Sequence, residues 1–156
     1  MTIDQDFMQR CLELGRIALE NGDAPIGSVI VFDGRIIAEA IESVKSNNDP
    51  SAHAELLAVR IACDKLKTLD LSGASLFSNV EPCVMCAYAI RQTGIGAVVF
   101  GIGNNRVGGA TSKFRLLIDS EFTEKFPPPK IKTGVLLCEC KSLWRLFEEL
   151  RRITGK

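Results

Sequence analysis

The chain is predicted to fold as a three-layer α/β/α domain around a mixed five-stranded sheet. Helical and strand-like patterns alternate along it, the two-residue turn Asp33-Gly34 joins the first two strands, and helices separate the later strands. A two-residue turn makes antiparallel neighbours, whereas a helical crossover makes parallel ones, so the sheet is expected to be mixed. With 156 residues and no linker-like tract, residues 1–156 are expected to form a single domain.

The first helix is predicted from apolar positions between Phe7 and Ala18 that recur at helical spacing. Asp4 or Asp6 is expected to cap it, and Asn21-Gly22 to end it.

A hairpin and a second helix follow. Residues 26–32 and 35–41 are rich in β-branched and apolar side chains and flank Asp33-Gly34, which is a strong hairpin signal. Residues 42–51 are polar and are expected to form a loop. Apolar spacing then predicts a helix from about Ser51 to Leu66.

The second half is predicted to alternate between strands and helices. Strands are expected over 74–80, 97–100 and 130–137, with helices over 83–92, over 113–119 as a short candidate, and around 143–150. The glycine-rich and asparagine-rich segment 101–112 is expected to be a loop that closes over a small substrate.

One set of residues carries metal chemistry. Cys83 and Cys86 lie three positions apart at a predicted helix start, where both thiolates can face one ion and the helix dipole favours their ionised form. His53 is the only histidine, so only three such ligands are available. A structural zinc site needs a fourth protein ligand, whereas a catalytic site leaves that position to water, so the shortage favours catalysis. Glu55 is expected to act as the general acid/base.

Bulk properties limit the partners. The 19 basic and 19 acidic residues balance, so no overall charge favours a polyanion, and nucleic acid is neither required nor excluded. No charged leader or membrane-length apolar run is present, so we expect a cytoplasmic protein with reduced cysteines and no membrane partner.

The segments Asn48–Leu56 and Val80–Ala87, which contain the motifs His-Ala-Glu and Pro-Cys-Val-Met-Cys, resemble the cytidine-deaminase-like superfamily. The nearest branch is similar to bacterial tRNA adenosine deaminases and small guanine or nucleoside deaminases. This resemblance implies the cytidine-deaminase-like fold, His53, Cys83 and Cys86 as Zn²⁺ ligands, and Glu55 as proton shuttle. It also implies backbone contributions from Ala54 and Cys83 to an oxyanion-type site, and a homodimer.

Substrate contacts are expected beside the zinc. Branch members commonly carry an asparagine eleven residues before the zinc histidine, whereas this chain has Glu42, which is read either as a contact to an N–H-bearing base edge or as a solvated loop residue. Phe114 is a candidate for stacking on the substrate, with a core role as the alternative. The residues expected to contact the substrate are Glu42, Asn48, Ala54, Pro82 and Phe114.

The predicted function is zinc-dependent hydrolytic deamination of a free nucleobase or nucleoside, with a guanine-type purine favoured because Glu42 suits its N–H donors. The first alternative is adenosine-to-inosine conversion in tRNA, which needs a basic channel; tRNA is therefore a possible partner but not the favoured one. A catalytically silent zinc-binding scaffold subunit is the second alternative, and a thiol-disulfide oxidoreductase a weaker one.

Overall fold

The computed structural model describes all residues from Met1 to Lys156. It contains four helices and five strands. In chain order they are α1 (Ile3–Glu20), β1 (Gly27–Phe32), β2 (Arg35–Ile41), α2 (Ala54–Leu66), β3 (Ala74–Val80), α3 (Val84–Thr93), β4 (Ala97–Ile102), β5 (Lys130–Thr133) and α4 (Leu137–Thr154). No helix is both long enough and apolar enough to cross a membrane.

The strands form the predicted mixed five-stranded sheet, and their order in it is β2-β1-β3-β4-β5. β1 is antiparallel to both β2 and β3, whereas β3, β4 and β5 are parallel to one another. The Asp33-Gly34 turn makes the tight β1–β2 connection, with positive φ at both residues. The later strands are parallel because α3 and the long 103–129 segment carry the chain back between them.

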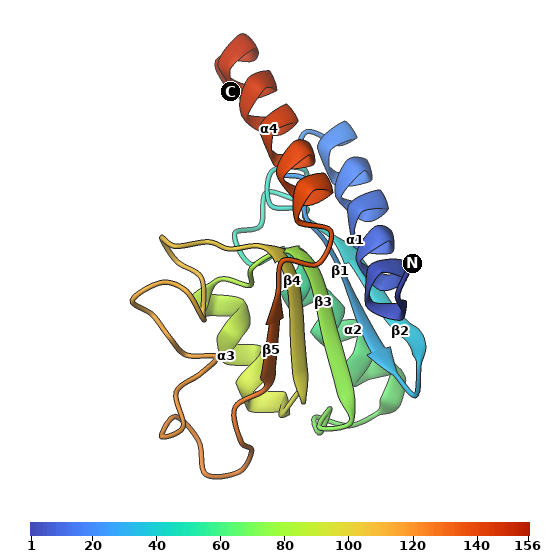
Figure 1. Ribbon diagram of the computed structural model, residues 1–156, viewed down its shortest axis with the longest axis vertical. Coiled ribbons are helices and arrows are strands. Elements are labelled where there is room, and N and C mark those ends of the chain that lie inside the picture. The colour runs from blue at the N-terminus through green and yellow to red at the C-terminus, as the bar shows by residue number, and fades with distance from the viewer.

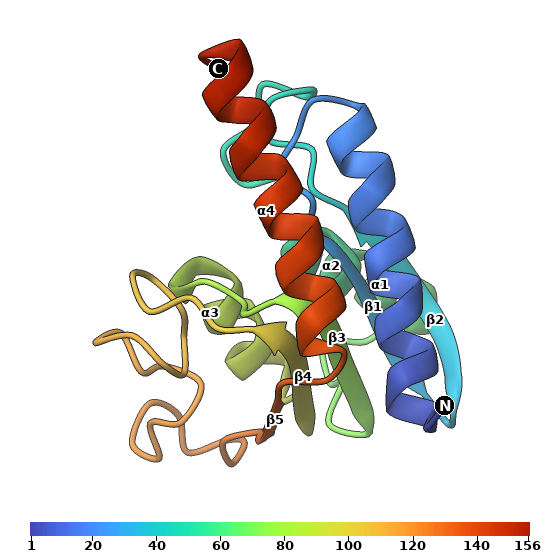
Figure 2. The same ribbon diagram turned by 45° about the horizontal axis from the view of Figure 1, so that its top comes forward.

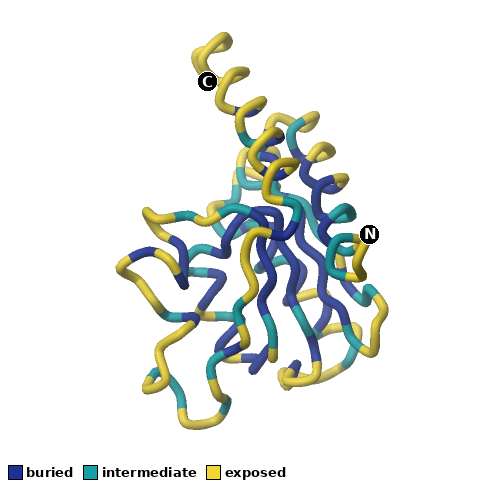
Figure 3. Tube along the Cα trace, viewed as in Figure 1, coloured by how far each residue is buried: buried dark blue, intermediate teal, exposed yellow.

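Helices cover both faces of the sheet, which gives the predicted three layers (Figures 1 and 2). Side chains of α1 and α4 pack on Val29, Phe77 and Val99, while those of α2 and α3 pack on the neighbouring Ile30 and Leu76 and on other opposite-face residues. Successive strand residues point to opposite faces, so two separate cores form. The three central strands β1, β3 and β4 are mostly buried, whereas the edge strand β5, the distal part of α4 and much of 103–129 are exposed (Figure 3).

Two helix starts differ from the prediction. Thr2, not Asp4 or Asp6, caps α1, because the Thr2 hydroxyl accepts from the Gln5 backbone N–H and the Gln5 side chain accepts from the Thr2 N–H. Helix α2 begins at Ala54 rather than near Ser51, because the Asp49 carboxylate accepts from both the backbone and the hydroxyl of Ser51 and holds a turn there.

The short helix expected over 113–119 is absent; these residues form turns. The N–H of Leu117 accounts for this difference, because it donates to the carbonyl of Gly109 at 2.8 Å and not to that of Lys113. Nη1 of Arg91 then holds the segment by donating to the carbonyls of Leu116 and Asp119, both at 2.6 Å. Those carbonyls therefore have a partner outside the segment. Strand β5 also ends before the expected 137, at Thr133, because Gly134 with φ 76° turns the chain toward α4.

Candidate active site

The candidate site lies where α2 and α3 begin. His53 is the N-cap residue of α2 and Cys83 is the N-cap residue of α3, while Cys86 lies in the first turn of α3. Their ligand atoms all lie within 4.8 Å of one another, and they are the one group of this kind in the molecule. The structure thus brings together three residues that are far apart in sequence.

The donor set fits zinc. One imidazole nitrogen and two sulfurs are ligands that zinc prefers, and three protein ligands leave one of four tetrahedral positions for water or substrate. Both helix N-termini point partial positive charge at the site, which helps hold thiolates.

Contacts within this group shift the pKa values of its three members. The Cys86 thiol donates to Cys83, which lowers the pKa of Cys83 to about 4 and raises the pKa of Cys86. Nδ1 of His53 lies 3.5 Å from the Cys83 sulfur, and this contact raises the pKa of His53 to about 9. One thiolate is therefore present near neutral pH, and metal binding would release the remaining protons.

Glu55 is buried at the same point. Its Oε1 accepts a hydrogen bond from the Ser78 hydroxyl at 3.2 Å, and its Oε2 lies 3.8 Å from the Cys86 sulfur. His53 is the N-cap residue, with an extended backbone at ψ 142°, and so it lies outside the helix. The angle between residues two positions apart in a helix therefore does not apply to His53 and Glu55. Burial raises the pKa of Glu55 to about 7, the range in which one group can both accept and donate a proton near neutrality. Sequence reasoning did not find Ser78.

Glu81 is a second buried carboxylate that sequence reasoning did not single out. It accepts from the backbone N–H groups of Asn104, Ala110 and Thr111 at 2.6 to 2.8 Å. Gly108 lies against this carboxylate, where a Cβ would clash with it. Glu81 therefore fixes the glycine-rich loop to the segment that leads into Cys83. In the sequence, the position of this glutamate directly before Pro82-Cys83 could have indicated its role.

Of the two loop residues expected to contact the substrate, Glu42 lies near the metal group and Asn48 is exposed on the loop. Glu42 is only 5% exposed, so the solvated reading is wrong; its Oε1 has no hydrogen-bond partner, and burial raises its pKa to about 8. The charges of Glu55 and His53 and the backbone of Ala54 all act on its titration, which places it beside the start of α2. Asn48 is exposed on the 42–53 loop with φ 50°.

The other expected contacts are distributed around the metal group. Ala54 and Pro82 are buried next to the ligands, and the Pro82 carbonyl accepts from the N–H of Gly109 at 2.9 Å. Phe114 is 42% exposed, so the core reading of this residue is wrong. It lines a groove with Val84, the residue after Cys83.

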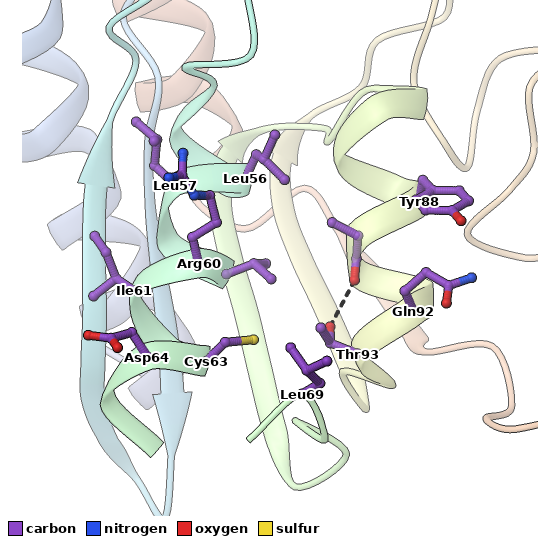
Figure 4. A pocket seen from close by; sticks show the side chains of 12 residues that line it. Leu56, Leu57, Arg60, Ile61, Cys63, Asp64, Leu69, Tyr88, Gln92 and Thr93 are labelled. Carbon is purple, nitrogen blue, oxygen red and sulfur yellow. Dashed lines mark hydrogen bonds between the residues drawn. The ribbon is translucent and has the colours of Figure 1, made fainter. Parts of the chain in front are cut away.

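A cavity of about 760 Å³ lies elsewhere, between α2 and α3 (Figure 4). Its lining is mostly apolar and includes Leu56, Ile61, Leu69 and Tyr88, but no metal-group residue. The chemistry of the metal group therefore does not take place in this cavity.

Comparison with known proteins agrees with the fold and the metal group. Residues 1–102 match the model of the cytidine and deoxycytidylate deaminase zinc-binding region. The chain belongs to this family, its cofactor is zinc, and its class of reaction is hydrolysis of C–N bonds, as the sequence predicted.

Within the family, the chain is similar to tRNA enzymes. It is 36% identical to the tRNA-specific adenosine deaminase of Bacillus subtilis, over 97% of this chain and 93% of the relative, and 40% identical to that of Aquifex aeolicus, over 71% and 74%. A solved structure from a study of A-to-I editing by tRNA:A34 deaminases superimposes with a TM-score of 0.82 at 33% identity, covering 88% of this chain and 98% of that one. A guanine deaminase from Bacillus subtilis is 39% identical but covers 63% of each chain, with a TM-score of 0.61.

These similarities correct two expectations. The prediction of a guanine-type free base or nucleoside as substrate was wrong, because relatives that are 36% and 33% identical over 97% and 90% of the chain are named tRNA-specific adenosine deaminases. The prediction that tRNA is not the favoured partner was wrong for the same reason. That prediction relied on the balance of acidic and basic residues, but a balanced total does not determine how charge is distributed over the surface.

Proposed function

We propose that the protein is a zinc-dependent adenosine deaminase that converts adenosine to inosine in tRNA. The observation that carries this proposal is the group of His53, Cys83 and Cys86 beside the buried Glu55, in a chain that matches a tRNA-specific adenosine deaminase over 97% of its length. The catalytically silent scaffold is disfavoured because Glu55 is buried beside the ligands, where a carboxylate without a chemical role costs stability.

The residues have separate roles in this proposal. His53, Cys83 and Cys86 hold zinc, which supplies the Lewis acidity that makes water nucleophilic near neutral pH. Oε2 of Glu55 takes one proton from the attacking water and passes it to N1 of adenine, where it stays, and then carries the second proton, from the new hydroxyl at C6, to the departing amine. Oxygen adds at C6, the C6–N bond breaks, and ammonia leaves. Ser78 orients Glu55 through its hydrogen bond to Oε1.

The substrate contacts remain proposals. Glu42 is the best supported contact to the base, because its buried Oε1 has no partner within the protein. Burial next to the metal ligands supports substrate contacts by Ala54 and Pro82, whereas Asn48 is exposed on its loop. We propose that all of these residues belong to a single domain over residues 1–156.

The test is inosine formation in an anticodon stem-loop RNA with adenosine at the wobble position, with free adenosine, guanine and cytidine in parallel. Inosine in the RNA alone, with binding that weakens as salt rises, supports the proposal. Ammonia release from a free base or nucleoside with no inosine in the RNA would overturn it.

We also propose that two copies associate through the apolar cavity between α2 and α3 (Figure 4). Ile61, Leu69 and Tyr88 are large exposed side chains at this face, and a second copy would remove them from water. Ile61→Glu should yield a monomer in sedimentation experiments, whereas Ile153→Glu, at an exposed residue of α4, should not. A wild-type monomer at micromolar concentration would contradict this assignment.

A further inference from the structure

An exposed aromatic side chain sits at a fixed place beside the metal group. Phe114 is 42% exposed, yet its backbone is held on both sides. It lines an open groove together with Val84, Leu116 and Ile118. We propose that this groove is a subsite for a nucleobase adjacent to the adenosine being deaminated, with the base stacked on Phe114. This inference rests on the proposed function.

The first anchor runs from the metal group. Cys83 forms an isolated β-bridge with Gly108, and the Gly108 carbonyl accepts from the Ser112 hydroxyl at 2.5 Å. The same Ser112 oxygen accepts from the backbone N–H of Phe114 at 3.0 Å. A short series of contacts therefore fixes the distance between Phe114 and a zinc ligand.

The second anchor runs from α3. Arg91 is 1% exposed, donates to the carbonyls of Leu116 and Asp119, and lies over the Phe122 ring at 5.4 Å. Tyr88, one turn earlier on α3, contacts the same ring edge-on at 5.6 Å. The segment that follows Phe114 is thus tied to α3, beside which it runs in both ribbon views (Figures 1 and 2).

This pre-organisation matters for binding. An exposed phenyl ring on a mobile loop would lose conformational freedom on stacking, whereas a ring whose backbone is already fixed loses less. Holding an apolar ring in water does not help folding, because an exposed ring does not contribute the free energy that its burial would provide. A ligand with a flat apolar face accounts for both observations.

The charges around the groove favour RNA over a neutral ligand. Lys113 and Arg115 flank Phe114 and are exposed, and the Lys113 ammonium lies 5.1 Å from the centre of the Phe114 ring. Asp119 also lines the groove, but its carboxylate accepts from the Glu121 N–H. Two cations beside an aromatic platform are the usual combination for a stacked base with its phosphates.

The decisive variants are Phe114→Ala, Phe114→Leu and Phe114→Tyr, with Arg35→Ala as a control at an exposed cation of the β1–β2 turn. Two readouts are needed: kinetics of inosine formation in the anticodon stem-loop, and binding of the labelled stem-loop by fluorescence anisotropy in a Glu55→Ala background. Melting temperatures confirm that each variant is folded.

Stacking predicts that Ala and Leu at position 114 raise KM and Kd for the stem-loop about 5- to 150-fold with a smaller change in kcat, and that Tyr restores both. Lys113→Ala with Arg115→Ala should reduce the salt dependence of binding, and Arg35→Ala should change neither readout.

Unchanged KM and Kd in Phe114→Ala and Phe114→Leu would overturn the subsite while leaving the proposed function intact. Stem-loop binding that depends on Phe114 without inosine formation by the wild type would refute the proposed function and keep an RNA-stacking site. A wild type that neither binds nor converts the stem-loop would refute both.

Discussion

The starts of α2 and α3 and the 103–129 segment are built in opposite ways. The helix starts are regular and buried or half-buried, and they hold the metal ligands and Glu55. The 103–129 segment is irregular and largely exposed, and side chains from elsewhere, Glu81 and Arg91, hold it in place. The comparison indicates that the reacting groups are positioned by secondary structure, while the segment that we propose to contact RNA is positioned by two buried charged side chains.

Zinc removal should have the largest effect on the helix-start region. A chelator is expected to reduce deamination below detection, because water then lacks the Lewis acid that activates it, and added zinc should restore activity. The measurement is inosine formation before and after dialysis, with metal content determined in parallel. Activity that persists in protein shown to be zinc-free would break the assignment of the metal group.

Glu55→Ala separates proton transfer from metal binding. We expect kcat to fall by about 10²- to 10⁴-fold, because general acid/base catalysis is lost, while zinc content stays unchanged. Glu55→Gln keeps the volume of the side chain and serves as the matched variant. Loss of zinc in either variant would mean that Glu55 supports the ligands rather than the reaction.

Glu81→Gln tests the other region. The amide would keep one acceptor but turn an NH₂ group toward backbone N–H donors, so we expect a loss of about 1–3 kcal/mol in the free energy of unfolding. Hydrogen exchange at residues 104–111 should accelerate, while exchange in β3 should not. Glu121→Gln, at an exposed carboxylate of the same segment, is the control and should have little effect.

The smallest expected effect is the pH dependence of the free energy of unfolding of the metal-free protein. Burial raises the pKa of Glu42 from 4.5 to about 8, so the folded state holds a proton that the unfolded chain releases in that interval. The free energy of unfolding should therefore fall as pH rises from 4.5 through about 8. Urea unfolding across this interval should give a shallower decline for Glu42→Gln. An equal slope in both proteins would show that Glu42 ionises normally.

The sequence was sufficient where the signal was local. Asp33-Gly34 between two apolar runs predicted the hairpin, and the spacing of Cys83 and Cys86 predicted two ligands on one helix start. The order of strand and helix patterns then predicted the mixed sheet, which the structure confirms.

Long-range contacts could not be predicted in this way. Arg91 helps to hold the non-helical segment 113–119 through carbonyls that lie 25 and 28 residues away from it. Glu81 makes contacts 23 to 30 residues distant, and a single sequence does not show that its carboxylate is buried. The two readings of Glu42 stayed open for the same reason, because only packing decides whether a loop carboxylate meets water.

The two N-cap residues have a consequence for folding. Neither His53 nor Cys83 makes a side-chain hydrogen bond to the free N–H groups of its helix, unlike Thr2 at the start of α1. A serine, threonine or aspartate at these positions would stabilise each helix by itself, whereas here the side chains are kept for a shared ion. Zinc held by both side chains would cross-link two helix ends that are separated by β3, and their first turns should loosen together when it leaves.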